Sequence, residues 1–182
     1  MSPNGTNPDR PDWMDAAAAA SRWHAGQRRR DGRTPYVAHC FRVAMIVRHE
    51  FACEDEDAIS IALLHDVIED TPADYDDVLE GFGEVVAAGV AALTKDMRLP
   101  KAPRELAYDA QIERADWRAR LVKLADTIDN LLDSDKPTER GLEKCRRAIA
   151  IAERSEDERL ARAVARTRAI LAQHGLEGGA SE

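Results

Sequence analysis

Apolar side chains recur three or four positions apart along most of this chain, which is the spacing of one buried face of a helix. The pattern predicts helices over residues 13–27, 37–50, 55–68, 74–82, 84–93, 104–115, 118–132, 138–153 and 157–173. No segment alternates polar and apolar residues for long enough to predict a β-strand. The predicted fold class is therefore all-α.

Proline, glycine and acidic residues mark the ends of several of these helices. Asp74 follows Pro72 and is expected to be a helix N-cap. The segment 28–35 reads as a basic turn that ends in proline. The segment 94–103 contains two prolines and three basic residues, and we expect it to be a long loop.

The length of 182 residues suits one domain with one hydrophobic core. We expect that domain over residues 12–175, with flexible tails at 1–11 and 176–182. Aromatic residues make up only 5% of the chain while alanine is abundant, which favours closely packed helices. The charged residues of 139–168 are expected to form exposed pairs around an apolar stripe.

The balance of charge limits the classes of ligand. Acidic residues outnumber basic ones by 34 to 26, which gives a formal net charge of −8. Such a chain is not expected to bind nucleic acid or an anionic membrane through its general surface. An anionic ligand would need a local basic pocket or a metal ion.

The three cysteines and the N-terminal region give a prediction about the compartment. Cys40, Cys53 and Cys145 are dispersed and odd in number, so we expect buried free thiols rather than disulfides or a metal knuckle. We find no secretory signal and no apolar run long enough to span a bilayer. A cytoplasmic location is therefore expected.

One short segment, residues 62–71, carries the strongest chemical signal. An apolar run leads into the adjacent pair His65 and Asp66, and Glu69 and Asp70 follow one helical turn later. On a continuous helix His65 would stack with Glu69, and Asp66 with Asp70. Four ionisable groups at the end of a buried helix favour a cation between them, and a divalent metal ion is the simplest choice.

Two other predicted helices supply further metal donors. His39 lies in the first turn of one of them, and Asp126 lies inside another strongly apolar helix. With His65 and Asp66 they offer two imidazoles and two carboxylates from three helices. A nitrogen and oxygen set of this kind with open positions suits Mn²⁺, Fe²⁺ or Co²⁺ better than a closed structural zinc site, although Zn²⁺ stays open.

The order His, His-Asp, Asp resembles that of the HD-domain metal-dependent phosphohydrolases. The flanking sequences HAGQRR at 24–29, PYVAH at 35–39, HDVIEDT at 65–71 and VKLAD at 122–126 are similar to the hydrolase domain of RelA/SpoT-type enzymes. Those enzymes remove the 3′-pyrophosphate of the alarmone guanosine tetraphosphate (ppGpp). The similarity runs from about residue 13 to 168, so the chain resembles the small stand-alone alarmone hydrolases, and a compact multi-helix HD-domain bundle is implied.

The resemblance implies a role for ten side chains. One manganese ion would be held by His39, His65, Asp66 and Asp126. The attacking water would be positioned and deprotonated by Glu69 and Asp70. The nucleotide would be bound by Arg29 at a phosphate and by Lys123 and Asn130 in the pocket, with Tyr36 nearby.

The chain departs from the family's usual residues at four positions. Thr127 stands in place of a basic residue, Asp129 in place of an aromatic residue or histidine, and Leu132 in place of an arginine; Cys40 replaces a common proline. Since the first three concern the side that reads base and phosphate, another 3′-phosphorylated nucleotide stays open as substrate. A nucleotide phosphomonoesterase and a non-catalytic nucleotide sensor are the alternative functions, and the oligomeric state is left open.

Overall fold

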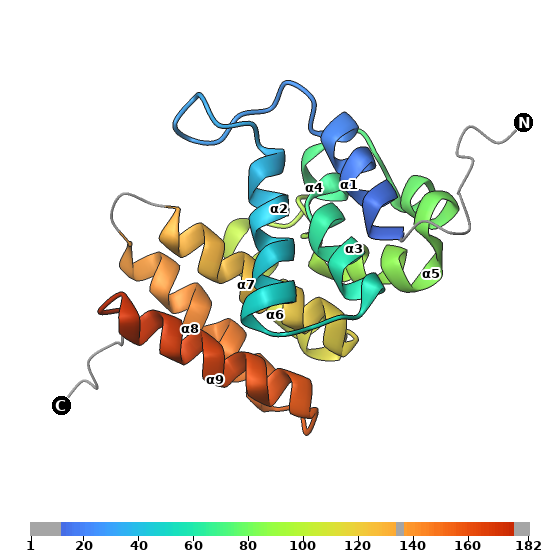
Figure 1. Cartoon of the computed structure of the whole chain (residues 1–182). Coiled ribbons are helices and arrows are strands. Elements are labelled where there is room, and N and C mark those ends of the chain that lie inside the picture. The colour runs from blue at the N-terminus through green and yellow to red at the C-terminus, as the bar shows by residue number, and fades with distance from the viewer. Residues whose placement is uncertain (1–11, 134–136, 177–182) are drawn as a thin grey trace, which may run out of the picture.

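The structure is a computed structural model, and it describes residues 12–133 and 137–176. In chain order its helices are α1 (Asp12–Trp23), α2 (Val37–Met45), the π-helical turn η1 (Ile46–Glu50), α3 (Glu56–Leu64), α4 (Val67–Asp70), α5 (Tyr75–Leu93), α6 (Lys101–Arg114), α7 (Trp117–Leu132), α8 (Glu139–Glu153) and α9 (Glu158–Gln173) (Figure 1). Among the described residues the only β-pairing is an isolated bridge between Arg28 and Pro35. The all-α prediction is confirmed, whereas the predicted tails fall almost wholly outside the described residues.

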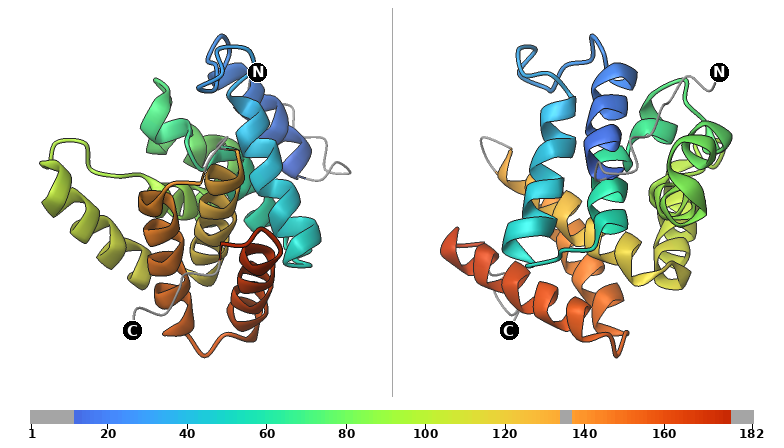
Figure 2. Two further views of the ribbon diagram at one scale, coloured as in Figure 1. Left: turned by 90° about the vertical axis from the view of Figure 1, so that its left-hand side faces the viewer. Right: turned by 45° about the vertical axis from the view of Figure 1, so that its right-hand side comes forward.

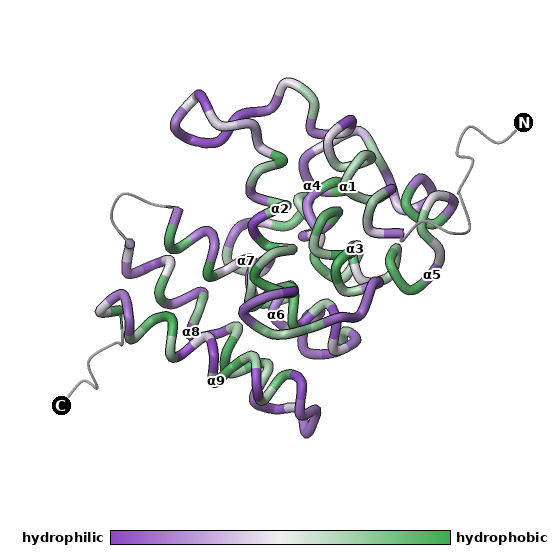
Figure 3. Tube along the Cα trace, in the orientation of Figure 1, coloured by the Kyte–Doolittle hydropathy of each residue, from purple (hydrophilic) through white to green (hydrophobic). Residues whose placement is uncertain are grey.

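Two helices form the centre of the molecule. Residues 58–64 of α3 are all buried, because this stretch is apolar on every face apart from Ser60. α7 packs against α2, α3, α8 and α9, and Figure 2 shows it enclosed between these helices from two further directions. Figure 3 shows the difference in hydropathy between the apolar α3 and the outer helices α8 and α9, along which polar and apolar residues alternate.

Small side chains and end caps explain several of these elements. Ala16, Ala19 and Ala20 of α1 are buried, and α1 packs closely on α3 through them. Asp74 caps α5 in a capping box with Asp77, as predicted for that residue. The three cysteines are free and buried, also as predicted. No helix in the described ranges combines the length and hydrophobicity that a membrane span requires.

Some predicted boundaries are wrong. The helix expected over 55–68 breaks, since α3 ends at Leu64 and α4 starts again at Val67. In contrast, the two helices expected over 74–82 and 84–93 are confirmed, because α5 is interrupted between them at Gly83, whose φ of 81° and ψ of 174° are not helical. The loop expected over 94–103 is shorter, because α6 begins at Lys101 and accommodates proline in its first turn, where no backbone donor is needed.

Candidate functional site

Two buried histidines face each other where α2, the end of α3 and α7 meet. His39 is 1% exposed and His65 is 2% exposed. Their Nε2 atoms lie 3.2 Å apart. His65 Nδ1 lies 2.8 Å from the carbonyl oxygen of Ala62, and His39 Nδ1 lies 2.6 Å from Asp129 Oδ2. A carbonyl and an ionised carboxylate only accept, so each Nδ1 donates a proton and each Nε2 is left to face the other ring.

Two carboxylates complete this group. Asp126 Oδ1 lies 3.4 Å from His39 Nε2 and 3.8 Å from His65 Nε2. Asp66 Oδ2 lies 3.5 Å and 3.0 Å from the same two nitrogens. Donor atoms of His39, His65 and Asp126 all lie within 4.8 Å of one another, and these three residues form a candidate metal site. The structure thus brings together the four residues that the sequence singled out as ligands, with Asp66 beside the compact group of three.

The break between α3 and α4 explains how neighbouring residues reach one point. On a continuous helix the side chains of His65 and Asp66 would diverge by about 100°. Asp66 instead has φ −103° and ψ −1°, at the junction of the two helices. The prediction of one continuous helix is therefore wrong. Asp66, the N-cap of α4, and Asp70 nevertheless remain one helical turn apart, as predicted.

The protonation of the group fits the binding of a cation. Burial lowers the pKa of His39, but hydrogen bonds with Asp126, Asp129 and Asp66 outweigh it and raise that pKa from 6.5 to about 11. Burial opposes the ionisation of Asp126, yet Lys123 and His39 hold its pKa below the usual range. The carboxylates therefore stay ionised and attract a positive charge, which a metal ion supplies when it displaces the imidazole proton.

The acid pair of α4 is held by two further side chains. Tyr36 Oη lies 2.7 Å from Asp66 Oδ2 and 2.9 Å from Asp70 Oδ2, so one phenolic proton is shared by two carboxylates. Burial and the charges of Asp66 and Asp70 raise the pKa of Tyr36. Glu69 Oε2 accepts from the backbone N–H of Lys95 at 3.0 Å, and Lys95 Nζ lies 3.3 Å from its Oε1.

A cleft of about 550 Å³ opens beside the histidines. Seven of the ten predicted site residues line it: Tyr36, Asp66, Glu69, Asp70, Lys123, Asp126 and Asn130. Arg29 is not among its lining residues; its Nη2 lies 2.8 Å from Asp133 Oδ2 and 3.1 Å from Asn130 Oδ1. The next residue, Arg30, lines the cleft instead.

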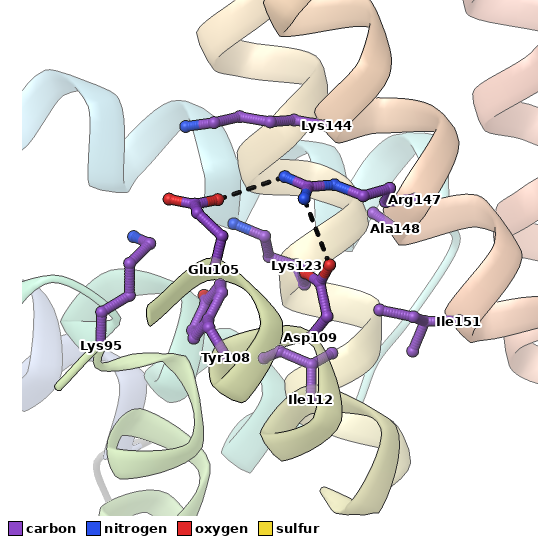
Figure 4. A pocket seen from close by; sticks show the side chains of 10 residues that line it. All are labelled: Lys95, Glu105, Tyr108, Asp109, Ile112, Lys123, Lys144, Arg147, Ala148 and Ile151. Carbon is purple, nitrogen blue, oxygen red and sulfur yellow. Dashed lines mark hydrogen bonds and ion pairs between the residues drawn. The ribbon is translucent and has the colours of Figure 1, made fainter. Parts of the chain in front are cut away.

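Basic side chains that the sequence analysis missed also line this cleft. They are Arg30, Lys95, Arg140 and Lys144. Lys95, Lys123 and Lys144 also line a smaller adjoining pocket, which Figure 4 draws; there they lie around Glu105, from which a dashed line runs to the guanidinium of Arg147. Lys144 has no hydrogen bond or ion pair with any described residue, and burial and the nearby Lys123 lower its pKa. The exposed pairs expected over 139–168 are present, for example Arg146 with Glu139, whereas Arg140 and Lys144 of α8 line the cleft instead.

The departures from the family pattern fall in different places. Thr127 lines the cleft, and its hydroxyl donates back to a backbone carbonyl of its own helix, that of Lys123 at 3.1 Å or Leu124 at 2.9 Å. Asp129 and Leu132 are not among the described residues that line it. Of these three positions, only Thr127 borders the cleft.

Comparison with known proteins agrees with this geometry. The family described as HD domain matches residues 16–151. A relative from Drosophila melanogaster, guanosine-3′,5′-bis(diphosphate) 3′-pyrophosphohydrolase MESH1, is 39% identical over 136 residues, which cover 74% of this chain and 76% of the relative. The human protein of the same name is 40% identical over 129 residues, which cover 70% of this chain and 72% of the relative.

A solved structure leads to the same family. It is that of a metazoan orthologue of SpoT that hydrolyses ppGpp and plays a role in starvation responses. The alignment has a TM-score of 0.74 and 31% identity, and it covers 92% of this chain and 97% of that one. This chain therefore belongs to the HD-domain family and, within it, to the group of the MESH1 proteins.

Proposed function

We propose that this protein is a metal-dependent guanosine-3′,5′-bis(diphosphate) 3′-pyrophosphohydrolase, which splits ppGpp into pyrophosphate and GDP. One observation carries the proposal. The compact donor set of His39, His65 and Asp126 lies beside a cleft lined by both acidic and basic residues, in a chain 39–40% identical to MESH1 relatives over most of its length.

Four side chains would hold the metal: His39, His65, Asp66 and Asp126. Their mixture of imidazole nitrogens and carboxylate oxygens fits Mn²⁺, with Fe²⁺, Co²⁺ and Zn²⁺ as alternatives. Such an ion, when bound, lowers the pKa of its water and neutralises charge on phosphoryl oxygens.

Glu69 and Asp70 would position the attacking water and accept its proton. Tyr36 orients the Asp70 carboxylate through its hydroxyl, and Lys95 orients the Glu69 carboxylate through two donors. The two acids thereby have fixed directions before a substrate arrives, which is what proton transfer at a defined atom needs.

The substrate carries two diphosphate groups, and basic side chains would bind them. Lys95, Lys123, Arg140 and Lys144 line the cleft, and the amide of Asn130 offers a further hydrogen-bonding group there. Arg29, which we expected at a phosphate, would instead be a positioning residue, because its Nη2 donates to Asn130 Oδ1 at 3.1 Å. Local positive charge of this kind lets a protein with a net charge of −8 bind a polyanion.

Turnover of ppGpp with added Mn²⁺ tests the proposal. We expect equimolar pyrophosphate and GDP, and a loss of at least about 100-fold in kcat for Asp66→Ala or after chelation, because the ion's contribution to the transition state is removed. Asp76→Ala, which removes an exposed acid of α5 outside the cleft, should keep wild-type activity. Orthophosphate as the product would indicate a phosphomonoesterase, and tight binding without any product would indicate a nucleotide sensor.

A further inference from the structure

Asp129 lies behind His39, on the side of the imidazole away from the other histidine. The side chain is 5% exposed, and its Oδ2 lies 2.6 Å from His39 Nδ1. The same carboxylate accepts from Arg42 Nε at 2.5 Å and from Arg42 Nη2 at 2.9 Å. Both oxygens are thus engaged by donors of fixed direction.

The helix register explains why these groups meet. His39 and Arg42 are three residues apart on α2, and Asp126 and Asp129 are three residues apart on α7, so each pair shares one helix face. α2 packs against α7. We call His39, His65, Asp66 and Asp126 the metal group. Each of the two helices therefore contributes one residue of this group, His39 or Asp126, and one residue that lies behind it, Arg42 or Asp129.

This arrangement determines which nitrogen of His39 faces the metal group. A carboxylate only accepts, so Asp129 requires a proton on Nδ1 and leaves Nε2 as the nitrogen that turns toward His65 and Asp126. The carbonyl oxygen of Ala62 accepts from His65 Nδ1 and likewise leaves Nε2 of His65 facing the metal site. A side-chain carboxylate thus orients His39 in the same way as a backbone carbonyl orients His65.

We infer that Asp129 is a positioning residue for the metal site, with Arg42 holding its carboxylate against His39. This inference rests on the metal site of the proposed function. The partner of a ligand imidazole fixes ring orientation and raises basicity, and its loss costs about 10- to 100-fold in metal affinity or activity. In this chain an acid on α7 thus supports the site from behind His39.

The alternative is that Arg42 and Asp129 form an ion pair that only holds α2 against α7. A variant of the neighbouring Asp133 distinguishes this alternative from a role in metal binding. Asp133 Oδ1 accepts from Arg42 Nη2 at 2.9 Å, but no hydrogen bond joins it to either histidine among the described residues. Asp133→Asn therefore removes a charge from beside Arg42, and from beside Arg29, which Asp133 also binds, without touching the imidazole. It is the matched control for Asp129→Asn.

Calorimetric titration of the metal-free protein with Mn²⁺ is the first measurement. We expect Asp129→Asn to raise the Kd by about 10- to 100-fold and Asp133→Asn to change it by less than about twofold. An unchanged Kd in folded Asp129→Asn, or an equal loss in Asp133→Asn, would overturn the inference. If Asp129→Asn does not fold by circular dichroism, Arg42→Gln decides, because it leaves the Asp129 carboxylate in place and removes only the partly exposed guanidinium that holds it. A raised Kd supports the inference and an unchanged one overturns it.

Nuclear magnetic resonance of the Zn²⁺-loaded protein with ¹⁵N-labelled histidine is the second measurement. We expect a slowly exchanging proton on His39 Nδ1 in the wild type and in Asp133→Asn, and its loss in Asp129→Ala, which leaves no acceptor at that position. Persistence of that proton in Asp129→Ala would overturn the inference. Neither measurement requires turnover, so a protein that binds the metal but does not hydrolyse ppGpp would refute the proposed function alone.

Discussion

Lys123 illustrates how a single side chain contributes to both halves of the site. Its Nζ donates to Asp126 Oδ2 at 2.8 Å and lies 5.1 Å from the centre of the Tyr108 ring. Burial alone would lower the pKa of Lys123, but the charge of Asp126 outweighs it, and the pKa is raised. The ammonium therefore remains charged while it borders both the metal group and the cleft.

Lys144 is the residue whose removal should separate substrate binding from catalysis. Because Lys144 lines the cleft and makes no hydrogen bond or ion pair with a described residue, Lys144→Ala should raise the KM for ppGpp about tenfold, as expected for one lost hydrogen bond to a charged group. The kcat should change little. Arg146→Ala is the matched control, since it removes a charge from the outer face of the same helix, where Arg146 pairs with Glu139. Steady-state kinetics in which both variants raise KM equally would contradict a specific role.

The sequence predicted the four residues that the structure brings together around the candidate metal site, but not the basic residues of the cleft. His39, His65, Asp66 and Asp126 stand in short motifs inside apolar helices, where an ionisable side chain needs a reason to be buried. Lys144 has no such signal, because a lysine on an amphipathic helix reads alike whether it faces solvent or a cleft. The contact of Asp129 with His39 depends on how α2 and α7 pack, and no local pattern encodes it.

Among the helices, the least predictable feature is the break between α3 and α4. The apolar run 58–64 and the following residues contain neither proline nor glycine, so local propensity favours a continuous helix. The chain nevertheless breaks at His65 and Asp66, where both side chains converge on the metal group. The periodicity of apolar residues predicted that helices form here. The break between them depends on contacts with other parts of the fold at the site, which no local pattern shows.

The contact of α3 with α5 depends on a glycine, which allows a test at the level of these helices. A Cβ built at Gly89 would lie 2.3 Å from Ile61 Cδ1 and 2.8 Å from its Cγ1, and Ile61 is fully buried. We expect Gly89→Ala to lower the free energy of unfolding by about 1–2 kcal/mol, because overpacking of about 1–3 kcal/mol exceeds the gain of about 1 kcal/mol in helix propensity.

Gly81, in the part of α5 before the break at Gly83, is the control. A Cβ at Gly81 would meet no atom within 4 Å, so Gly81→Ala should leave stability unchanged or raise it by up to about 1 kcal/mol. Urea titrations of both variants measure the difference. Equal stability of the two would show that α3 and α5 can separate to accept the methyl group.

At the scale of the whole molecule, the metal group joins helices from distant parts of the chain. His39 comes from α2, His65 and Asp66 from the junction of α3 and α4, and Asp126 from α7. Two of these helices, α3 and α7, also contribute much of the buried apolar core. An ion bound here would therefore oppose the separation of these helices and should stabilise the fold as a unit, because the unfolded chain cannot assemble the same donors.

Thermal unfolding with and without metal measures this coupling. At a free Mn²⁺ concentration about 100 times the Kd, binding should add about 2.7 kcal/mol. For a domain of this size that corresponds to a rise in Tm of about 5–10 °C. Ca²⁺ should give a much smaller rise, because it prefers oxygen ligands and the site offers two imidazoles. His65→Gln should lose most of the Mn²⁺ effect. A rise of equal size with Ca²⁺ or in His65→Gln would mean that the ion acts at the acidic surface, and that the histidines do not couple metal binding to folding.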